Sequence, residues 1–204
     1  YTYSIGIDVV GRIVEVASGM SLEEFFRARI FEPLGMRDTT FSLPAARTSR
    51  LVPLHAIENG ALVRAAAQGA YANVTSSSGG AALLPPGRAY LRFAQMLLNG
   101  GELDGARLLS RKTVELMTTS HTIDIGPSVV SSGYGFGYGF SVRESLGLSS
   151  RIGSEGMYTW SGILGTYFWV DPQEQLAAVM MLQLYPRPDE RAREIITTLT
   201  YAAI

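Results

Sequence analysis

The feature of this sequence that most constrains its fold is an alternation of glycine with large apolar residues over residues 133–142, which read GYGFGYGFSV. A repeat of two residues is typical of a β-strand, because successive side chains point to opposite faces. Glycine on most of one face indicates that another backbone comes close there. We therefore predict one strand over this segment. Its other face, in the core, would carry Tyr134, Phe136, Tyr138, Phe140 and Val142.

Two more apolar segments follow, LGTYFWV at residues 164–170 and LAAVMMLQL at 176–184. The Asp-Pro-Gln-Glu sequence between them is typical of the tight turn of an antiparallel hairpin, so Asp171 is interpreted as a turn residue. Pro188 then precedes a last segment of helical period. The apolar side of that helix would hold Ala192, Ile195, Ile196 and Leu199.

Helical patterns fill the earlier part of the chain. Ser21 and Glu24 form a capping box for a helix that ends before Pro33, and Ser110 caps another short helix. Residues 42–87 consist of loop-forming sequences with short apolar segments between them. The first helix would end near Gly19, and its apolar residues are Val9, Val10, Ile13, Val14 and Ala17. A third helix carries its apolar face at Tyr90, Phe93, Ala94, Leu97 and Leu98.

The order of these elements predicts the fold class. Helices and loops fill roughly residues 5–130, antiparallel strands roughly 134–184, and a helix completes the chain. This segregation is typical of an α+β fold. A sheet of three or four strands with one covering helix normally needs further strands and a second helical layer. We therefore expect a fold that is incomplete at its N-terminus.

Composition excludes several classes of function. The chain has 204 residues, of which 47% are hydrophobic and 17% charged, a balance typical of a packed globular protein. Its formal net charge is −1 and Lys112 is its only lysine, so nucleic-acid binding, which needs clustered cations, is not expected. No apolar run reaches the roughly 18 residues of a membrane span.

Metal and cofactor chemistry are not expected either. The chain has no cysteine, and its two histidines, His55 and His121, are far apart in sequence and are interpreted as surface residues. This excludes a thiolate metal site and a cysteine nucleophile, and it argues against a Ser-His-Asp triad. We expect no metal and no cofactor.

Five segments, in this order, resemble one known family. They are YTYSIGIDVVGRIVEVASG, IFEPLGMRDTTF, YLRFAQMLLNGGELDGARLLSRKTVELM, YGFGYGFSV and WSGILGTYFWVDP. The sequence is similar to the serine β-lactamase and penicillin-binding-protein-like superfamily, and most similar to its class C-like carboxylesterases. The resemblance covers almost the whole chain but only the C-terminal half of a member. It implies a β-lactamase/DD-peptidase-like fold, an antiparallel sheet flanked by helices plus a helical subdomain. Residues 1–130 and 131–204 would be two portions of the same catalytic domain.

Members of this family carry three motifs, and the sequence contains two. Tyr3-Ser4-Ile5 fits the second motif in its esterase form, and Trp160-Ser161-Gly162 fits the third, with Trp in place of Lys or His. The first motif, Ser-x-x-Lys, is absent, because Leu109 stands three residues before Lys112. The resemblance therefore implies that the nucleophile is not in this chain and lies upstream of Tyr3.

The resemblance also implies roles for the residues that match. Tyr3 would be the general base of acylation, with its phenolate favoured by the ammonium of the absent lysine. The backbone N–H of Ile163 would form the oxyanion hole together with the N–H of the nucleophilic serine. Trp160, Ser161, Gly162 and Ser4 would contact the substrate. Gly162 would let the substrate lie close to the strand, since it has no Cβ.

Each of these residues also has a plainer interpretation. Tyr3 could be a packed tyrosine, and Trp160 a core or edge aromatic residue. Ser76, Ser77 and Ser78 are interpreted as a loop rather than as nucleophiles, since no lysine accompanies them. Asp8 would favour the positive N-terminal end of the first helix.

The sequence therefore predicts a serine hydrolase, most simply a carboxylesterase working through an acyl-enzyme, that is inactive as this chain alone. One alternative is a non-catalytic binding or scaffold protein with the same fold. Another is a β-lactamase or D-Ala-D-Ala carboxypeptidase. The expected partners are a small-molecule ester or β-lactam substrate and the missing N-terminal portion of the same protein.

Overall fold

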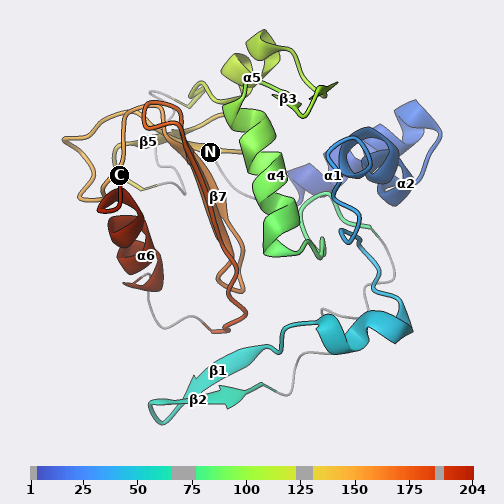
Figure 1. Ribbon diagram of the computed structural model, residues 1–204, viewed down its shortest axis with the longest axis horizontal. Helices are drawn as coiled ribbons and strands as arrows, with labels where there is room; N and C mark the ends of the chain where they lie inside the picture. The colour runs from blue at the N-terminus through green and yellow to red at the C-terminus, as the bar shows by residue number, and fades with distance from the viewer. Residues whose placement is uncertain (1–3, 66–76, 123–130, 187–190) are drawn as a thin grey trace.

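The computed structural model describes residues 4–65, 77–122, 131–186 and 191–204. It is an α+β structure, as predicted, in which a five-stranded antiparallel sheet lies between helices (Figure 1). Helix α4 (Gly87–Leu98) covers one face of the sheet, and α6 (Arg191–Tyr201) covers the other.

The strands of the main sheet follow one another in chain order, and each pairs antiparallel with the next. They are β5 (Tyr134–Phe136), β6 (Ser141–Arg143), β7 (Tyr158–Ser161), β8 (Tyr167–Asp171) and β9 (Leu176–Met180). The predicted hairpin between the last two apolar segments is confirmed, since Asp171 pairs with Leu176 across the β8–β9 turn. Its second strand is shorter than predicted and ends at Met180.

The prediction of one strand over residues 133–142 is wrong. The segment forms a hairpin, in which β5 turns back on β6 and Phe136 pairs with Ser141. Gly137 donates to the carbonyl of Phe140 at 2.8 Å, and Gly139 has a φ of 93°, which favours glycine. The close backbone approach that the glycines predicted is confirmed at Gly137. An added Cβ there would lie 2.1 Å from the carbonyl oxygen of Met117. Alternation along the sequence therefore did not place the aromatic residues on one face.

The core lies on both faces of the sheet, because β8 is buried along its whole length. Phe168 and Val170 belong to the cluster that packs against α4. Tyr167 and Trp169, which alternate with them, belong to the cluster on the α6 face, where Tyr201 packs. Alternate side chains of one strand thus anchor two different helices.

The predicted helices of the described residues are confirmed, and their end signals act as expected. Gly19 has a φ of 70° and donates to the carbonyl of Glu15, Ser21 and Glu24 form the capping box, and Ser110 accepts from the amide of Thr113. Pro188 lies outside the described residues. The other helices are α1 (Gly6–Ser18), α2 (Leu22–Phe26) with its π-helical continuation η1 (Arg27–Phe31), the 3-10 helix η2 (Ala45–Arg50) and α5 (Arg111–Met117).

The first 130 residues also contain two short hairpins that the sequence analysis did not predict. They are β1 (His55–Glu58) with β2 (Ala61–Arg64), and β3 (Glu102–Leu103) with β4 (Ala106–Arg107). Their turns are Asn59-Gly60 and Asp104-Gly105, and all four residues have positive φ. Asn-Gly and Asp-Gly favour this turn because both residues adopt left-handed backbone angles readily.

The first helix is confirmed as α1, but most of its apolar residues are exposed. Val9, Val10 and Ile13 are 52–59% exposed, and Gly11 is the buried residue of α1. An added Cβ on Gly11 would lie 3.1 Å from Leu22 and 3.2 Å from the Cα of Gly79. The helix therefore packs through a glycine against the described part of the chain, and its wide apolar face is open.

A buried carboxylate connects α6 to the sheet. Asp171 is fully buried, and it accepts hydrogen bonds from the hydroxyl of Tyr201 at 2.6 Å and from the amide of Ser154 at 2.9 Å. The turn amides of Gln173 and Glu174 also donate to it, at 3.1 and 3.3 Å. Asp171 is thus a turn residue, as predicted, but also the acceptor that joins the turn, a neighbouring loop and the last helix.

We expect Tyr201→Phe to lower the free energy of unfolding of the full-length protein by about 1–2 kcal/mol, because it removes one hydrogen bond to a buried carboxylate. Urea unfolding followed by circular dichroism measures the change. Tyr138→Phe is the matched control, since Tyr138 is exposed and its hydroxyl makes no hydrogen bond within the described residues. Equal effects of the two substitutions would contradict the role of this bond.

Candidate active site

Trp160, Ser161 and Gly162, which were predicted to contact the substrate, and Ile163, the predicted oxyanion-hole donor, lie together at one end of the sheet. Trp160 and Ser161 are the last residues of β7, and they pair with Phe168 and Tyr167 of β8. The loop that follows is tight, because Gly162 donates to the carbonyl of Thr166 at 2.9 Å. The segment from Trp160 to Ile163 is therefore held by backbone hydrogen bonds.

Trp160 is half-buried and fixed by a neighbouring ring. Its indole meets Phe136 of β5 edge to face, with centroids 4.9 Å apart and planes at 80°. It also packs against the core cluster on the α4 face. Directly paired residues share a face of a sheet, so Ser161, which pairs with Tyr167, lies on the opposite face. Trp160 and Ser161 can therefore contact one ligand only where the strand ends.

The amide of Ile163 meets a requirement of an oxyanion hole. Its side chain is 62% exposed, and its N–H has no acceptor within the part of the chain that the structure describes. A donor that stabilises a developing oxyanion must be fixed in place and available to the substrate. The amide next to Gly162 has both properties, and its catalytic role stays a prediction.

Gly162 has a local reason to be glycine that differs from the one predicted. An added Cβ would lie 2.2 Å from the hydroxyl oxygen of Thr166. A side chain at residue 162 would therefore force the Thr166 hydroxyl to move. Close approach of a substrate stays a second, separate prediction.

The other predicted part of the site lies at the start of α1. Ser4 is exposed and directly precedes Ile5, whose carbonyl accepts from the amides of Asp8 and Val9 at 2.9 and 3.1 Å. Tyr3 lies outside the described residues. No hydrogen bond or ring contact of the described residues joins Ser4 to the segment 160–163. The convergence of the two parts on one pocket stays a prediction.

Four tyrosines of the core are unsuited to act as bases. Burial raises the pKa of Tyr90 to about 12, and burial also raises the pKa values of Tyr158, Tyr167 and Tyr201. These phenols stay protonated at neutral pH. All four pack in or against the core, and Tyr201 also donates a hydrogen bond to Asp171.

The histidines do not form a catalytic or metal site with each other. His121 is exposed, stacks on Tyr138 with ring centroids 4.5 Å apart, and has its Nε2 2.9 Å from the carbonyl oxygen of Leu116. His55 is half-buried in β1, so only His121 is a surface residue as predicted. Within the described ranges, no group of three histidine or acidic side chains is arranged to hold a metal ion, and no helix is long and apolar enough to cross a membrane.

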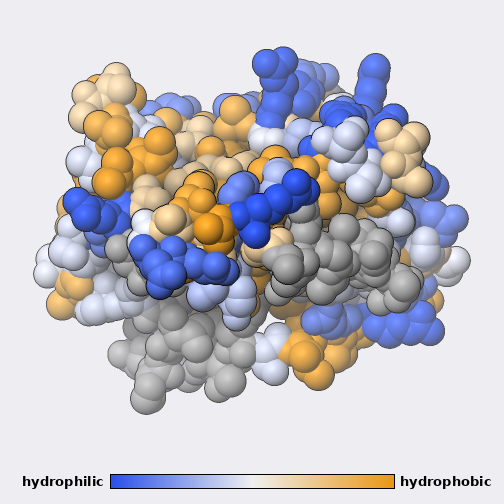
Figure 2. All heavy atoms as spheres, turned by 90° about the horizontal axis from the view of Figure 1, so that it is seen from below, coloured by the Kyte–Doolittle hydropathy of each residue, from blue (hydrophilic) through white to orange (hydrophobic). Residues whose placement is uncertain are grey.

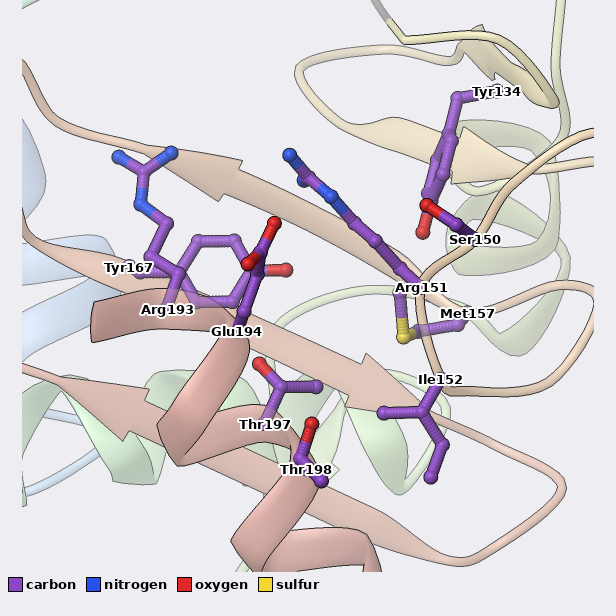
Figure 3. A pocket seen from close by; sticks show the side chains of 10 residues that line it. All are labelled: Tyr134, Ser150, Arg151, Ile152, Met157, Tyr167, Arg193, Glu194, Thr197 and Thr198. Atoms are coloured by element: carbon purple, nitrogen blue, oxygen red, sulfur yellow. The ribbon is translucent and has the colours of Figure 1, made fainter. Parts of the chain in front are cut away.

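A cavity of about 260 Å³ lies between the sheet and α6 (Figure 3). None of the predicted site residues lines it. Its walls are formed by Tyr134, Ser150, Arg151, Ile152, Met157, Tyr167, Arg193, Glu194, Thr197 and Thr198.

One contact near the predicted site was not predicted. Ser78, which the sequence interpretation placed in a loop, donates a hydrogen bond to the carboxylate of Asp8 in the first turn of α1. The pair of glycines after Ser78 was the available signal, since adjacent glycines indicate a close backbone approach.

Comparison with known proteins identifies the family. The model of the Beta-lactamase family matches residues 2–202, almost the whole chain. The chain belongs to this family.

Three similar proteins illustrate the range of the match. Protein Rv1367c of Mycobacterium tuberculosis (strain ATCC 25618 / H37Rv) is 33% identical over 91% of this chain and 49% of its own length. Esterase EstB of Burkholderia gladioli is 27% identical over 89% of this chain and 49% of its own length. The structure of simvastatin synthase (LovD6 mutant) from Aspergillus terreus superposes with a TM-score of 0.83 and 25% identity, covering 98% of this chain and 54% of that one. The chain thus spans about half the length of the curated relatives it matches.

We expect Gly162→Ala to reduce both the stability and the activity of the full-length protein, because the new methyl group collides with the Thr166 hydroxyl. Adding Thr166→Ala removes that hydroxyl and should restore stability. Unfolding free energy and turnover of a test ester, p-nitrophenyl butyrate, measured on both variants and on Thr166→Ala alone, separate two effects. If activity returns with stability, only turn packing requires glycine. If activity stays low, the substrate also needs the space.

Proposed function

We propose that the full-length protein is a serine hydrolase that cleaves carboxylic esters through an acyl-enzyme. Membership of the Beta-lactamase family over residues 2–202 and the presence of esterases among the relatives support this class of reaction. The observation that carries the proposal is the end of β7. There Trp160-Ser161-Gly162 precedes an amide, that of Ile163, which has no acceptor in the described part of the chain.

In the proposed reaction, the nucleophilic serine and its lysine belong to a part of the protein outside these 204 residues. Tyr3, as a phenolate favoured by the lysine ammonium, takes the serine proton while the serine oxygen bonds to the ester carbonyl carbon. The carbonyl electron pair moves to its oxygen, which the amides of Ile163 and of the serine hold. Collapse then breaks the bond to the alcohol, which takes the proton from Tyr3. Water cleaves the acyl-enzyme by the same sequence of steps.

Trp160 favours an uncharged substrate. Members that act on peptides or β-lactams resemble this chain but carry Lys or His at the matching position, and that cation pairs with the substrate carboxylate. An indole offers apolar surface and one N–H donor instead. Its ring is fixed against Phe136, so it provides a rigid wall for an acyl or alkyl group.

We expect Tyr3→Phe to lower kcat for p-nitrophenyl butyrate in the full-length protein by about 10²–10⁴-fold, the usual contribution of a general base. Tyr1→Phe is the matched control and should retain activity. A chromogenic cephalosporin in the same assay distinguishes the ester from the β-lactam as the preferred substrate. Unchanged hydrolysis by Tyr3→Phe would refute the proposed role, and absence of Ser-x-x-Lys upstream would favour a non-catalytic scaffold.

We further propose that the remaining half of the protein covers the open face of α1. Ile5, Val9, Ile13 and Val16 follow one another at helical spacing and are 53–71% exposed. Such a stripe normally packs against another element. The chain spans about half the length of its relatives, so the required partner is the other half of the same polypeptide. Apolar residues also reach the surface at several other places (Figure 2).

We expect residues 1–204 to be inactive alone and to regain esterase activity when co-expressed with the upstream portion of the protein. Ile13→Asp should weaken this association at least tenfold, because it places a charge in an apolar contact. Leu62→Asp is the matched control, since Leu62 is similarly exposed but lies on the β1–β2 hairpin. Gel filtration of the co-expressed chains measures the association, and equal effects of both substitutions would contradict the assigned face.

A further inference from the structure

The carboxylate of Asp8 joins the first turn of α1 to a segment some 70 residues later in the chain. The hydroxyl of Ser78 donates to Oδ1 of Asp8, and the amide of Gly80 donates to the same oxygen at 3.4 Å. The Gly80 amide also donates to the Ser78 hydroxyl oxygen at 3.2 Å. Three polar groups therefore form one small network between the two segments.

Two glycines bring the same backbones into contact. An added Cβ on Gly79 would lie 2.2 Å from the carbonyl oxygen of Ile7 and 3.3 Å from the Cα of Gly11. No side chain fits between residue 79 and the helix, so the fit is steric as well as polar. The segment 78–80, which we call the glycine clamp, thus lies directly on the first two turns of α1.

The start of α1 has few other fixed contacts. Ile5 is the N-cap residue and offers no capping side chain, and Ile5, Ile7 and Val9 are 39–71% exposed. Within the described residues, the bonds of Asp8 are the only side-chain hydrogen bonds that join residues 4–9 to another segment. The direction of the helix start therefore depends on the clamp.

We infer that Asp8 is a positioning residue for the esterase reaction: by holding the glycine clamp, it fixes the first turn of α1, which follows Tyr3 and Ser4 directly in the sequence. This inference rests on the proposed function of Tyr3. A catalytic base must be held within a fraction of an ångström of its working place, so a small displacement of the helix start costs activity. Asp8 touches no reacting atom and acts only through the backbone that follows Tyr3.

Two substitutions of Asp8 distinguish a loss of catalytic geometry from a loss of folding stability. Asp8 is exposed, and an exposed hydrogen bond contributes little to overall stability, so Asp8→Ala should leave Tm almost unchanged. Its kcat should fall about tenfold or more, with KM less affected, because the base is misplaced. Asp8→Asn retains an oxygen acceptor and should stay within about threefold of the wild type, since the amide can still bind the Ser78 hydroxyl and the Gly80 amide.

A glycine pair provides the steric control. Gly79→Ala should reduce kcat as Asp8→Ala does, because its methyl group pushes the clamp off the helix. Gly6→Ala, in the first turn of the same helix, has no heavy atom within 4 Å of the added methyl group and should retain activity. Equal activity of Gly79→Ala and Gly6→Ala would overturn the inference, as would wild-type activity of Asp8→Ala or equal losses in Asp8→Ala and Asp8→Asn.

Two further measurements on the full-length protein distinguish failure of this inference from failure of the proposed function. Hydrogen–deuterium exchange of peptides covering residues 77–80 should become faster in Asp8→Ala, whether or not Tyr3 is catalytic. Adding Asp8→Ala to Tyr3→Phe should cost little further activity, because both act on one group. Activity in Tyr3→Phe would refute the base itself, while full activity or unchanged exchange in Asp8→Ala, with Tyr3→Phe inactive, would refute the clamp alone.

Discussion

Burial of β8 on both of its faces is the constraint on which the rest of the described structure depends. Every residue of Tyr167–Asp171 is buried, so each face of the sheet needs its own helical cover. Helix α4 provides it against Phe168 and Val170, and α6 against Tyr167 and Trp169. Because β7 is the neighbour of β8 and is held in register with it, the same constraint fixes the strand end that carries Trp160. The candidate site thus lies at the end of β7, which is held in place by the fully buried strand β8.

Short local signals made much of this fold predictable. The capping box at Ser21, the left-handed Gly19 and the turn at Asp171 each act through hydrogen bonds between close neighbours, so sequence spacing determines them. The prediction for GYGFGYGFSV was wrong because alternation is the same in a strand and in a hairpin. The turn bond from Gly137 to Phe140 and the contact of Gly137 with Met117 are visible only in the structure. Likewise, the hairpins at Asn59-Gly60 and Asp104-Gly105 were not predicted, because their strands are too short to show a period.

The candidate site was predictable only in part, for a related reason. The motif match predicted that Trp160-Ser161-Gly162 lies on a strand, and the structure places Trp160 and Ser161 at the end of β7, with Gly162 and Ile163 in the tight turn that follows. The contact of Asp8 with Ser78 joins residues that no spacing rule relates, so sequence patterns gave only paired glycines as a signal. Long-range contacts of this kind depend on how elements pack, which is why site geometry is harder to infer than site composition.

The position of β9 has a consequence for the solubility of this chain when it is produced alone. It is the last strand in the sheet order, and in the described residues its backbone is paired by β8 on one side only. An open strand border offers a row of amide and carbonyl groups to any extended peptide that meets it. Separated from the rest of its polypeptide, the chain would tend to associate with other copies of itself through the exposed edge of β9. Its solubility would then depend on whether that edge is covered.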